Sequence, residues 1–191
     1  MANFDKYYPT LEHHEGGYAS AEAAAKIKDT GGETYKGIAR NYNASWAGWK
    51  IIDEYKRVHG TPKWNSTIPI DELNKMVKQY AKSAYWDTLK LDSVKNQSLA
   101  QLIYDFGFNS GRATPVLIVQ RLLKLSVDGK MGMQTISQIN KAPQQNLFDT
   151  LKSARIKFLT DSKKIKETIK PQLIERADSF FFQEAETEQL Q

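Results

Sequence analysis

The chain has 191 residues, of which 40% are hydrophobic and none is cysteine. This length and apolar content predict a folded globular protein of one domain or two small ones. The lack of cysteine excludes disulfides, thiol nucleophiles and cysteine-based metal sites. The net charge of +5 is spread without a dense basic block, so it indicates a solvated basic surface first and contact with an anionic polymer second.

The beginning of the chain, MANFDKYYPTLEHH, has no charged segment followed by an apolar run, so we expect no cleavable secretory signal. No stretch of 18 consecutive apolar residues occurs, and we therefore expect no membrane span. Action outside the cytoplasm would then require release or export by another route.

The first half of the chain predicts helices around one small hairpin. A short helix is expected over residues 9–15, with Pro9 in its first turn and an end at Gly16-Gly17. The segment DTGGETYKGI has the residues of a tight turn and a short hairpin. Helical spacing of apolar residues then predicts helices over residues 45–58 and 71–86, the second capped by Asp71.

The second half predicts helices only. A helix over residues 97–111 should end at Gly111, and the next should be capped by Thr114 and buried because it is apolar nearly all round. Three further helices are expected, over residues 133–140, 144–162 and 171–182. The fold class is therefore mainly α with one small β-hairpin.

Glu15 is the first candidate for chemistry. It stands at the end of the predicted helix, where the negative end of the helix dipole raises a carboxyl pKa. Partial burial would raise the pKa further, and a carboxylic acid kept protonated near neutral pH is suited to general acid catalysis. A Glu before Gly-Gly is also a common surface residue at a helix end, and the spacing alone favours that interpretation.

The glycine-rich turn supplies the next candidates. Gly32 and its neighbours would let Asp29 or Thr34 approach a substrate or a water closely, although Asp29 could simply cap the turn. Most aromatic residues follow helical spacing and belong in the core. A platform on which sugar rings stack could still come from Tyr18, Tyr35, Trp46 and Trp86.

Asp105 and Asn109 lie four residues apart on one helical face, together with Gln101. Such a polar stripe could line a cleft, or it could form an internal hydrogen-bond network that fixes helix packing. Adjacent His13 and His14 point in different directions on a helix, so no metal site is expected. Nucleotide-binding loops and the nucleophile motif of serine hydrolases are absent.

Several motifs together resemble glycoside hydrolase family 108, a family of lysozyme-like N-acetylmuramidases from phage and bacteria, some described as secretion activators. The motifs are EGGY, D-x-GG-x-T-x-x-GI, YW-D, DFGFNSG, and VQRLLKLSVDGKMGMQTISQI, which is similar to the peptidoglycan-binding segment of that family. The resemblance covers roughly residues 8–180. Family members commonly carry a Gly-Trp pair before an arginine, whereas here Arg176 follows KPQLIE without that pair.

The resemblance implies a lysozyme-like fold, with a catalytic part over residues 8–91 and a helical peptidoglycan-binding part over residues 92–183 packed into the same unit. It implies Glu15 as the catalytic acid. It also implies Asp29 and Thr34 as further catalytic groups, and Asn109 and Ser110 as parts of a family Asn-Ser/Thr-Gly element that we expect to contact the substrate. The glycine turn, the aromatic candidates and the polar stripe described above add Gly32, Tyr35 and Asp105 as expected substrate contacts. No cofactor, metal or nucleic acid is expected, and the oligomeric state is left open.

The expected reaction is hydrolysis of the β-1,4 bond between N-acetylmuramic acid and N-acetylglucosamine in peptidoglycan glycan strands. Glu15 would protonate the leaving oxygen, while Asp29 or Thr34 would steady the transition state or position water. The alternatives are a non-catalytic peptidoglycan-binding module, a lytic transglycosylase, and a helical nucleic-acid-binding protein favoured only by the basic charge.

Overall fold

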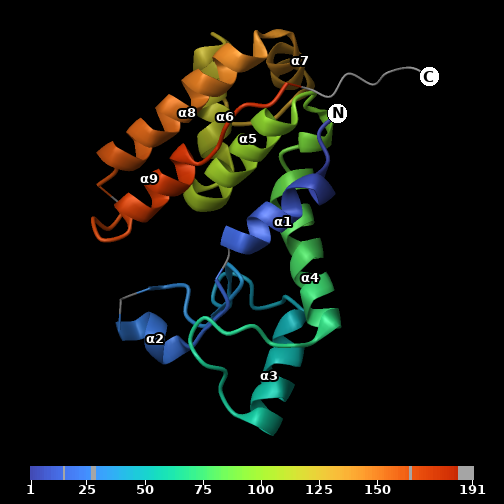
Figure 1. Cartoon of the computed structure of the whole chain (residues 1–191), viewed down its shortest axis with the longest axis vertical. Coiled ribbons are helices and arrows are strands. Elements are labelled where there is room, and N and C mark those ends of the chain that lie inside the picture. The colour runs from blue at the N-terminus through green and yellow to red at the C-terminus, as the bar shows by residue number, and fades with distance from the viewer. Residues whose placement is uncertain (15, 27–28, 164, 185–191) are drawn as a thin grey trace, which may run out of the picture. The chain divides into compact units, whose positions relative to one another are not determined.

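The computed structural model describes residues 1–14, 16–26, 29–163 and 165–184 (Figure 1). It is mainly α-helical with one small sheet, which confirms the fold class expected from the sequence. The chain divides into two compact units: an N-terminal unit, Asp5–Lys82, and a C-terminal unit, Ser83–Gln191 together with Met1–Phe4. No helix among the described residues is both long and apolar enough to cross a bilayer.

The sheet of the N-terminal unit has three antiparallel strands in the order β1 (Tyr18–Ala19), β2 (Thr34–Tyr35) and β3 (Ile38–Ala39). The predicted hairpin is β2–β3, and its two turn residues, Lys36 and Gly37, both have positive φ, at 43° and 77°. Positive φ at both central positions gives the backbone twist that a two-residue hairpin turn needs. The sequence did not predict β1, which pairs with β2.

The described helices of the N-terminal unit are α1 (Phe4–His14), α2 (Ala21–Lys26), α3 (Gly48–His59) and α4 (Asp71–Ala81). A π-helical turn, η1 (Lys82–Asp87), follows α4, and all of it except Lys82 belongs to the C-terminal unit. The expected start of α1 at Pro9 was wrong, since this proline lies inside the helix. Burial of Phe4, Tyr7 and Leu11, which follow one another at helical intervals of three and four residues, offsets the single backbone hydrogen bond that a proline removes. Asp71 was expected to cap α4, but it is the first helical residue and makes no capping bond.

The core of this unit joins the sheet to α3 and α4. Tyr18, Tyr35 and Ile38 from the strands pack with Trp49 and Ile52 of α3, and the cluster also includes Ile68, Leu73 and Val77. The tyrosines of β1 and β2 face each other in register, Tyr18 opposite Tyr35 and Ala19 opposite Thr34. The strands are only two residues long, so packing on the helices, and not the ladder alone, stabilises them.

The C-terminal unit is a helical bundle in which α8 lies against α5, α6, α7 and α9 (Figure 1). The described elements are η2 (Leu91–Ser93), α5 (Gln97–Ser110), α6 (Ala113–Leu122), α7 (Met133–Lys141), α8 (Gln144–Asp161) and α9 (Lys170–Asp178). Asn96 caps α5 by accepting a hydrogen bond from the amide of Leu99 at 2.9 Å. The predicted cap at Thr114 was wrong, because its hydroxyl donates to the carbonyl of Ser110 at 2.7 Å and α6 begins at Ala113.

Candidate functional site

The segment after Glu15 is fixed to the loop that precedes α4. The amide of Gly17 donates to Oδ1 of Asn65 at 2.7 Å, and the amide of Asn65 donates to the carbonyl of Tyr18 at 2.8 Å. A Cβ on Gly17 would lie 2.3 Å from the carbonyl oxygen of Ser66, so only glycine permits this approach. Glu15 itself lies outside the described residues.

The turn that carries Asp29 and Thr34 is closed by short-range hydrogen bonds. Oδ1 of Asp29 accepts from the amide of Gly31 at 2.9 Å, as a turn-capping aspartate does, while the residue stays exposed. Thr34 Oγ1 donates to the carbonyl of Gly32 at 3.1 Å, and Gly32 has a φ of +68°. Because Thr34 pairs with Ala19, the turn lies beside the strand that begins three residues after Glu15.

A buried carboxylate, Glu33, joins this turn to β1 and α3. Its Oε1 accepts from the Tyr18 hydroxyl at 2.5 Å and from Lys56 Nζ at 2.7 Å, and its Oε2 is ion-paired with Arg40 Nε at 2.8 Å. Arg40 also donates two hydrogen bonds to Asp53. Burial, and then the hydrogen bond to Glu33, raise the pKa of Tyr18. Sequence reasoning missed Glu33 because its three partners come from separate elements.

Tyr35 lies in the core and not on the surface. Its ring is 0% exposed, its hydroxyl accepts from the amide of Ile68 at 3.2 Å, and burial raises its pKa. Tyr18 and Trp86 are equally buried, and Trp46 is half-buried. The aromatic platform suggested from the sequence is therefore wrong for Tyr18, Tyr35 and Trp86, since these rings present no face to a ligand in this structure.

Asp105 occupies the interior of the C-terminal unit at 0% exposed. Its carboxylate accepts from Arg155 of α8, and from Arg176 of α9 at 2.5 Å and 3.0 Å. Asn109 Nδ2 donates to the Asp105 carbonyl at 2.8 Å. Burial raises the pKa of Asp105, but the two guanidinium groups outweigh it and hold the pKa below its ordinary value. Of the two interpretations of this polar stripe, the geometry favours the internal network.

Arg155 and Ser110 have buried polar atoms in the same region. Arg155 is wholly buried between the rings of Phe106 and Phe180, 5.7 Å and 5.5 Å from the guanidinium carbon, as a cation–π pair requires. Its Nε and Nη1, and the buried Oγ of Ser110, have no hydrogen-bond partner among the described residues. Ser110, Asp105 and Asn109 belong to the C-terminal unit, whereas Asp29 and Thr34 belong to the N-terminal unit.

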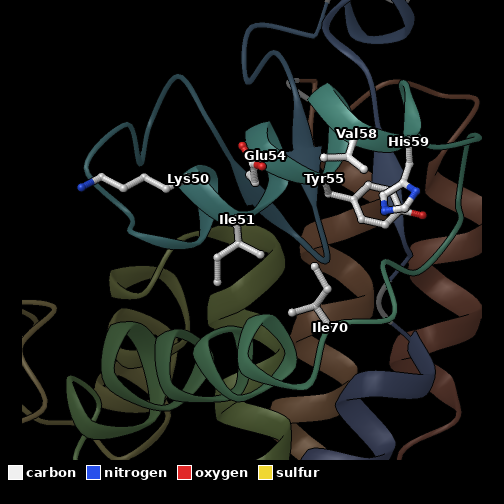
Figure 2. Close-up of a pocket in the computed structure, with 7 residues that line it drawn as sticks. All are labelled: Lys50, Ile51, Glu54, Tyr55, Val58, His59 and Ile70. Atoms are coloured by element: carbon white, nitrogen blue, oxygen red, sulfur yellow. The ribbon is translucent and has the colours of Figure 1, made fainter.

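A pocket of about 370 Å³ lies along α3 in the N-terminal unit (Figure 2). Ile51, Tyr55 and Ile70 give it an apolar lining, and the His59 ring packs on Tyr55 with centroids 4.6 Å apart. None of the site residues expected from the sequence lines this pocket. In the part of the chain that the structure describes, no group of three acidic or histidine side chains is placed to hold a metal ion.

Comparisons with known proteins agree with these features. A family profile described as Glycosyl hydrolase 108 matches residues 8–111, and one described as Predicted Peptidoglycan domain matches residues 114–172. Among solved structures, "Structure of Brucella abortus SagA" is similar, with a TM-score of 0.61 and 20% identity over 93% of this chain and 94% of that one. At this identity the likeness shows the fold. The search of curated proteins found no match.

Proposed function

The chain belongs to the glycosyl hydrolase 108 family, and from this premise we propose that it is a muramidase. The two profile matches make it a glycoside hydrolase that acts on peptidoglycan. The proposed bond is the β-1,4 linkage between N-acetylmuramic acid and N-acetylglucosamine. The proposed general acid is Glu15, which stands first in the EGGY motif, within the matched residues.

The proposed mechanism uses a general acid and a second polar group. Glu15 gives its proton to the oxygen of the departing sugar, and the end of α1 favours the protonated acid because the helix dipole is negative there. As the bond breaks, positive charge develops on the sugar ring, and Asp29 or Thr34 would stabilise it or hold the attacking water. Glu33 keeps the turn that bears them next to β1 through its bond to Tyr18.

One observation carries the proposal: the strand after Glu15 is fixed on both sides. The pairing of Ala19 with Thr34 joins it to the turn of Asp29, and the bond between Gly17 and Asn65 joins it to the opposite loop. A general acid must be held within about 3 Å of the oxygen that it protonates, so the segment next to it has to be rigid.

The products of digestion test the proposal directly. We expect purified peptidoglycan sacculi treated with the full chain to yield new reducing N-acetylmuramic acid ends, measured by borohydride reduction and mass spectrometry. Anhydro-muramic ends would show a lytic transglycosylase instead. Reducing N-acetylglucosamine ends would show a glycosidase of other bond specificity. Sacculi that bind the protein without any new ends would show a non-catalytic binding module.

Replacing Gly32 with valine should harm activity out of proportion to stability. The φ of +68° and the approach of a Cβ to Asn41 Nδ2 at 2.8 Å strain the turn, at a cost of about 1–3 kcal/mol. The displaced turn carries Asp29 and Thr34, so we expect kcat/KM to fall roughly 10-fold or more. Thermal melts and turnover on the same protein check this.

The matched control for that variant is Gly60→Val. Gly60 has a similar φ of +78°, but nothing lies within 4 Å of its added Cβ. It should lose comparable stability while keeping its kcat/KM. An equal loss of activity in both variants, or a collapse of the melting temperature in Gly32→Val, would show that the turn is only structural.

Asn109→Ala separates a cleft from an internal network. Asn109 bonds to Asp105 in its own helix, so we expect the free energy of unfolding to fall by roughly 1–3 kcal/mol with kcat/KM within a few-fold of wild type. Asn140→Ala is the control, because it also removes a half-buried side-chain amide of the same unit, one that donates to the carbonyl of Ser93. It should likewise lose stability and keep its kcat/KM. A tenfold loss of kcat/KM in Asn109→Ala alone would place Asn109 against the substrate.

A further inference from the structure

We propose that Trp64 and Tyr42 are the aromatic residues on which the sugar rings of the substrate stack. This inference rests on the proposed function, because it assigns glycan contacts to the same site. The two side chains are 67% and 68% exposed, and both belong to the N-terminal unit. Neither was singled out by the sequence, whose aromatic candidates are buried or half-buried.

Trp64 is held next to the segment that follows Glu15 through hydrogen bonds made by its neighbour in the chain. The next residue, Asn65, has a φ of 59° and holds Gly17 with its side chain and Tyr18 with its backbone amide. The backbone next to Trp64 is therefore set by the EGGY segment. The indole N–H of Trp64 donates to no described residue and remains available to a ligand.

Tyr42 is hydrogen-bonded to the turn that bears Asp29. Its hydroxyl is hydrogen-bonded to Thr30 Oγ1, and its amide donates to the carbonyl of Ala39 at 3.2 Å. A Cβ on Gly31 would lie 3.7 Å from Cε2 of the Tyr42 ring, so the ring edge lies beside the glycine pair. The Tyr42 ring is thus fixed by its hydroxyl group and one ring edge, while most of the side chain is exposed.

These two exposed rings suit a polysaccharide better than other ligands. Burying aromatic area is favourable, and a sugar ring offers a flat face of C–H groups that matches an aromatic face. Tyr and Trp have few rotatable bonds, and anchoring at Asn65 and Thr30 lowers the entropy lost when a ligand binds. The EGGY segment and the turn of Asp29 would then each have one stacking residue beside them for an extended glycan strand.

The first test uses tryptophan fluorescence of the full chain with Glu15→Gln, which prevents turnover. Of the four tryptophans, Trp49 and Trp86 are buried and Trp46 is half-buried, so iodide should quench mainly Trp64. The probe is peptidoglycan glycan strands freed of their stem peptides by an amidase. We expect these strands to protect Trp64 from iodide, and free stem peptides to give no protection.

The second test uses variants in the active chain. Trp64→Ala and Tyr42→Ala should each raise KM on the glycan strands roughly 10-fold, whereas Trp64→Phe should recover most of the affinity. Val58→Ala is the control, because it removes another exposed apolar side chain of the same unit, 57% exposed on α3, without a tie to either segment. It should leave KM unchanged.

Three outcomes would overturn the inference. The first is that the glycan gives no protection of Trp64 from iodide, and the second is that Trp64 becomes protected when the protein concentration is raised in the absence of glycan. The third is that the Trp64→Ala Tyr42→Ala double variant has the same KM as Val58→Ala. Full glycan cleavage by that double variant would reject the stacking residues and leave the muramidase proposal standing. Conversely, Trp64-dependent glycan binding by a chain that cleaves nothing would support the stacking residues and reject the muramidase.

Discussion

Replacing Glu15 with glutamine should abolish glycan hydrolysis and leave the fold intact. Glutamine keeps the shape of the side chain but has no acidic proton to give to the leaving oxygen. General acid catalysis is worth about 10²–10⁴-fold, so kcat/KM should fall by that factor. Release of reducing ends from purified peptidoglycan measures the loss, and the circular dichroism spectrum and melting temperature should match the wild type.

Glu12→Gln is the matched control for this loss. Glu12 is an exposed glutamate of α1, three residues before Glu15 in the sequence, and its Oε1 accepts from Lys36 Nζ at 2.9 Å. Glu12 is exposed but Lys36 is buried, so loss of the ion pair should cost about 1–3 kcal/mol of stability while changing activity by only a few-fold. Hydrolysis by Glu15→Gln within a few-fold of wild type would reject Glu15 as the acid.

The largest loss of stability is expected for Asp105→Asn. The substitution leaves Arg155 and Arg176 without the carboxylate that compensates their charge, and removing one partner of a buried ion pair costs about 3–5 kcal/mol. Urea denaturation measures the change. Asp161→Asn is the control, because its ion pair with Lys157 is exposed to solvent and contributes little to stability.

Acid should weaken the wild type through the same group. The pKa of Asp105 is lowered in the folded protein, so its carboxylate stabilises the fold above its unfolded pKa of about 3.9. That stability is lost as the pH falls from there through the lower folded pKa. Asp105→Asn should therefore show less acid dependence than wild type below about pH 4. If Asp105→Asn were as stable as Asp161→Asn, the network of Asp105, Arg155 and Arg176 would not be essential for stability.

Local sequence patterns were sufficient for most helices and for the hairpin. Apolar spacing located α5 and α8, because a helix that buries one face must repeat that face every 3.6 residues. The glycine-rich segment located the hairpin, since a two-residue turn needs positive φ and Gly37 supplies it readily. Several short motifs taken together identified the family. These features depend on residues that are neighbours in the chain.

Only the tertiary structure decided which polar and aromatic residues are available to a ligand. Asp105 meets Arg155 and Arg176, which are 50 and 71 residues away, and no local pattern indicates that pairing. Tyr35 and Trp64 are both aromatic residues of the N-terminal unit, yet the first lies in the core and the second is exposed. Burial depends on what packs against a side chain from distant elements, so it follows from the assembled fold and not from spacing along the chain.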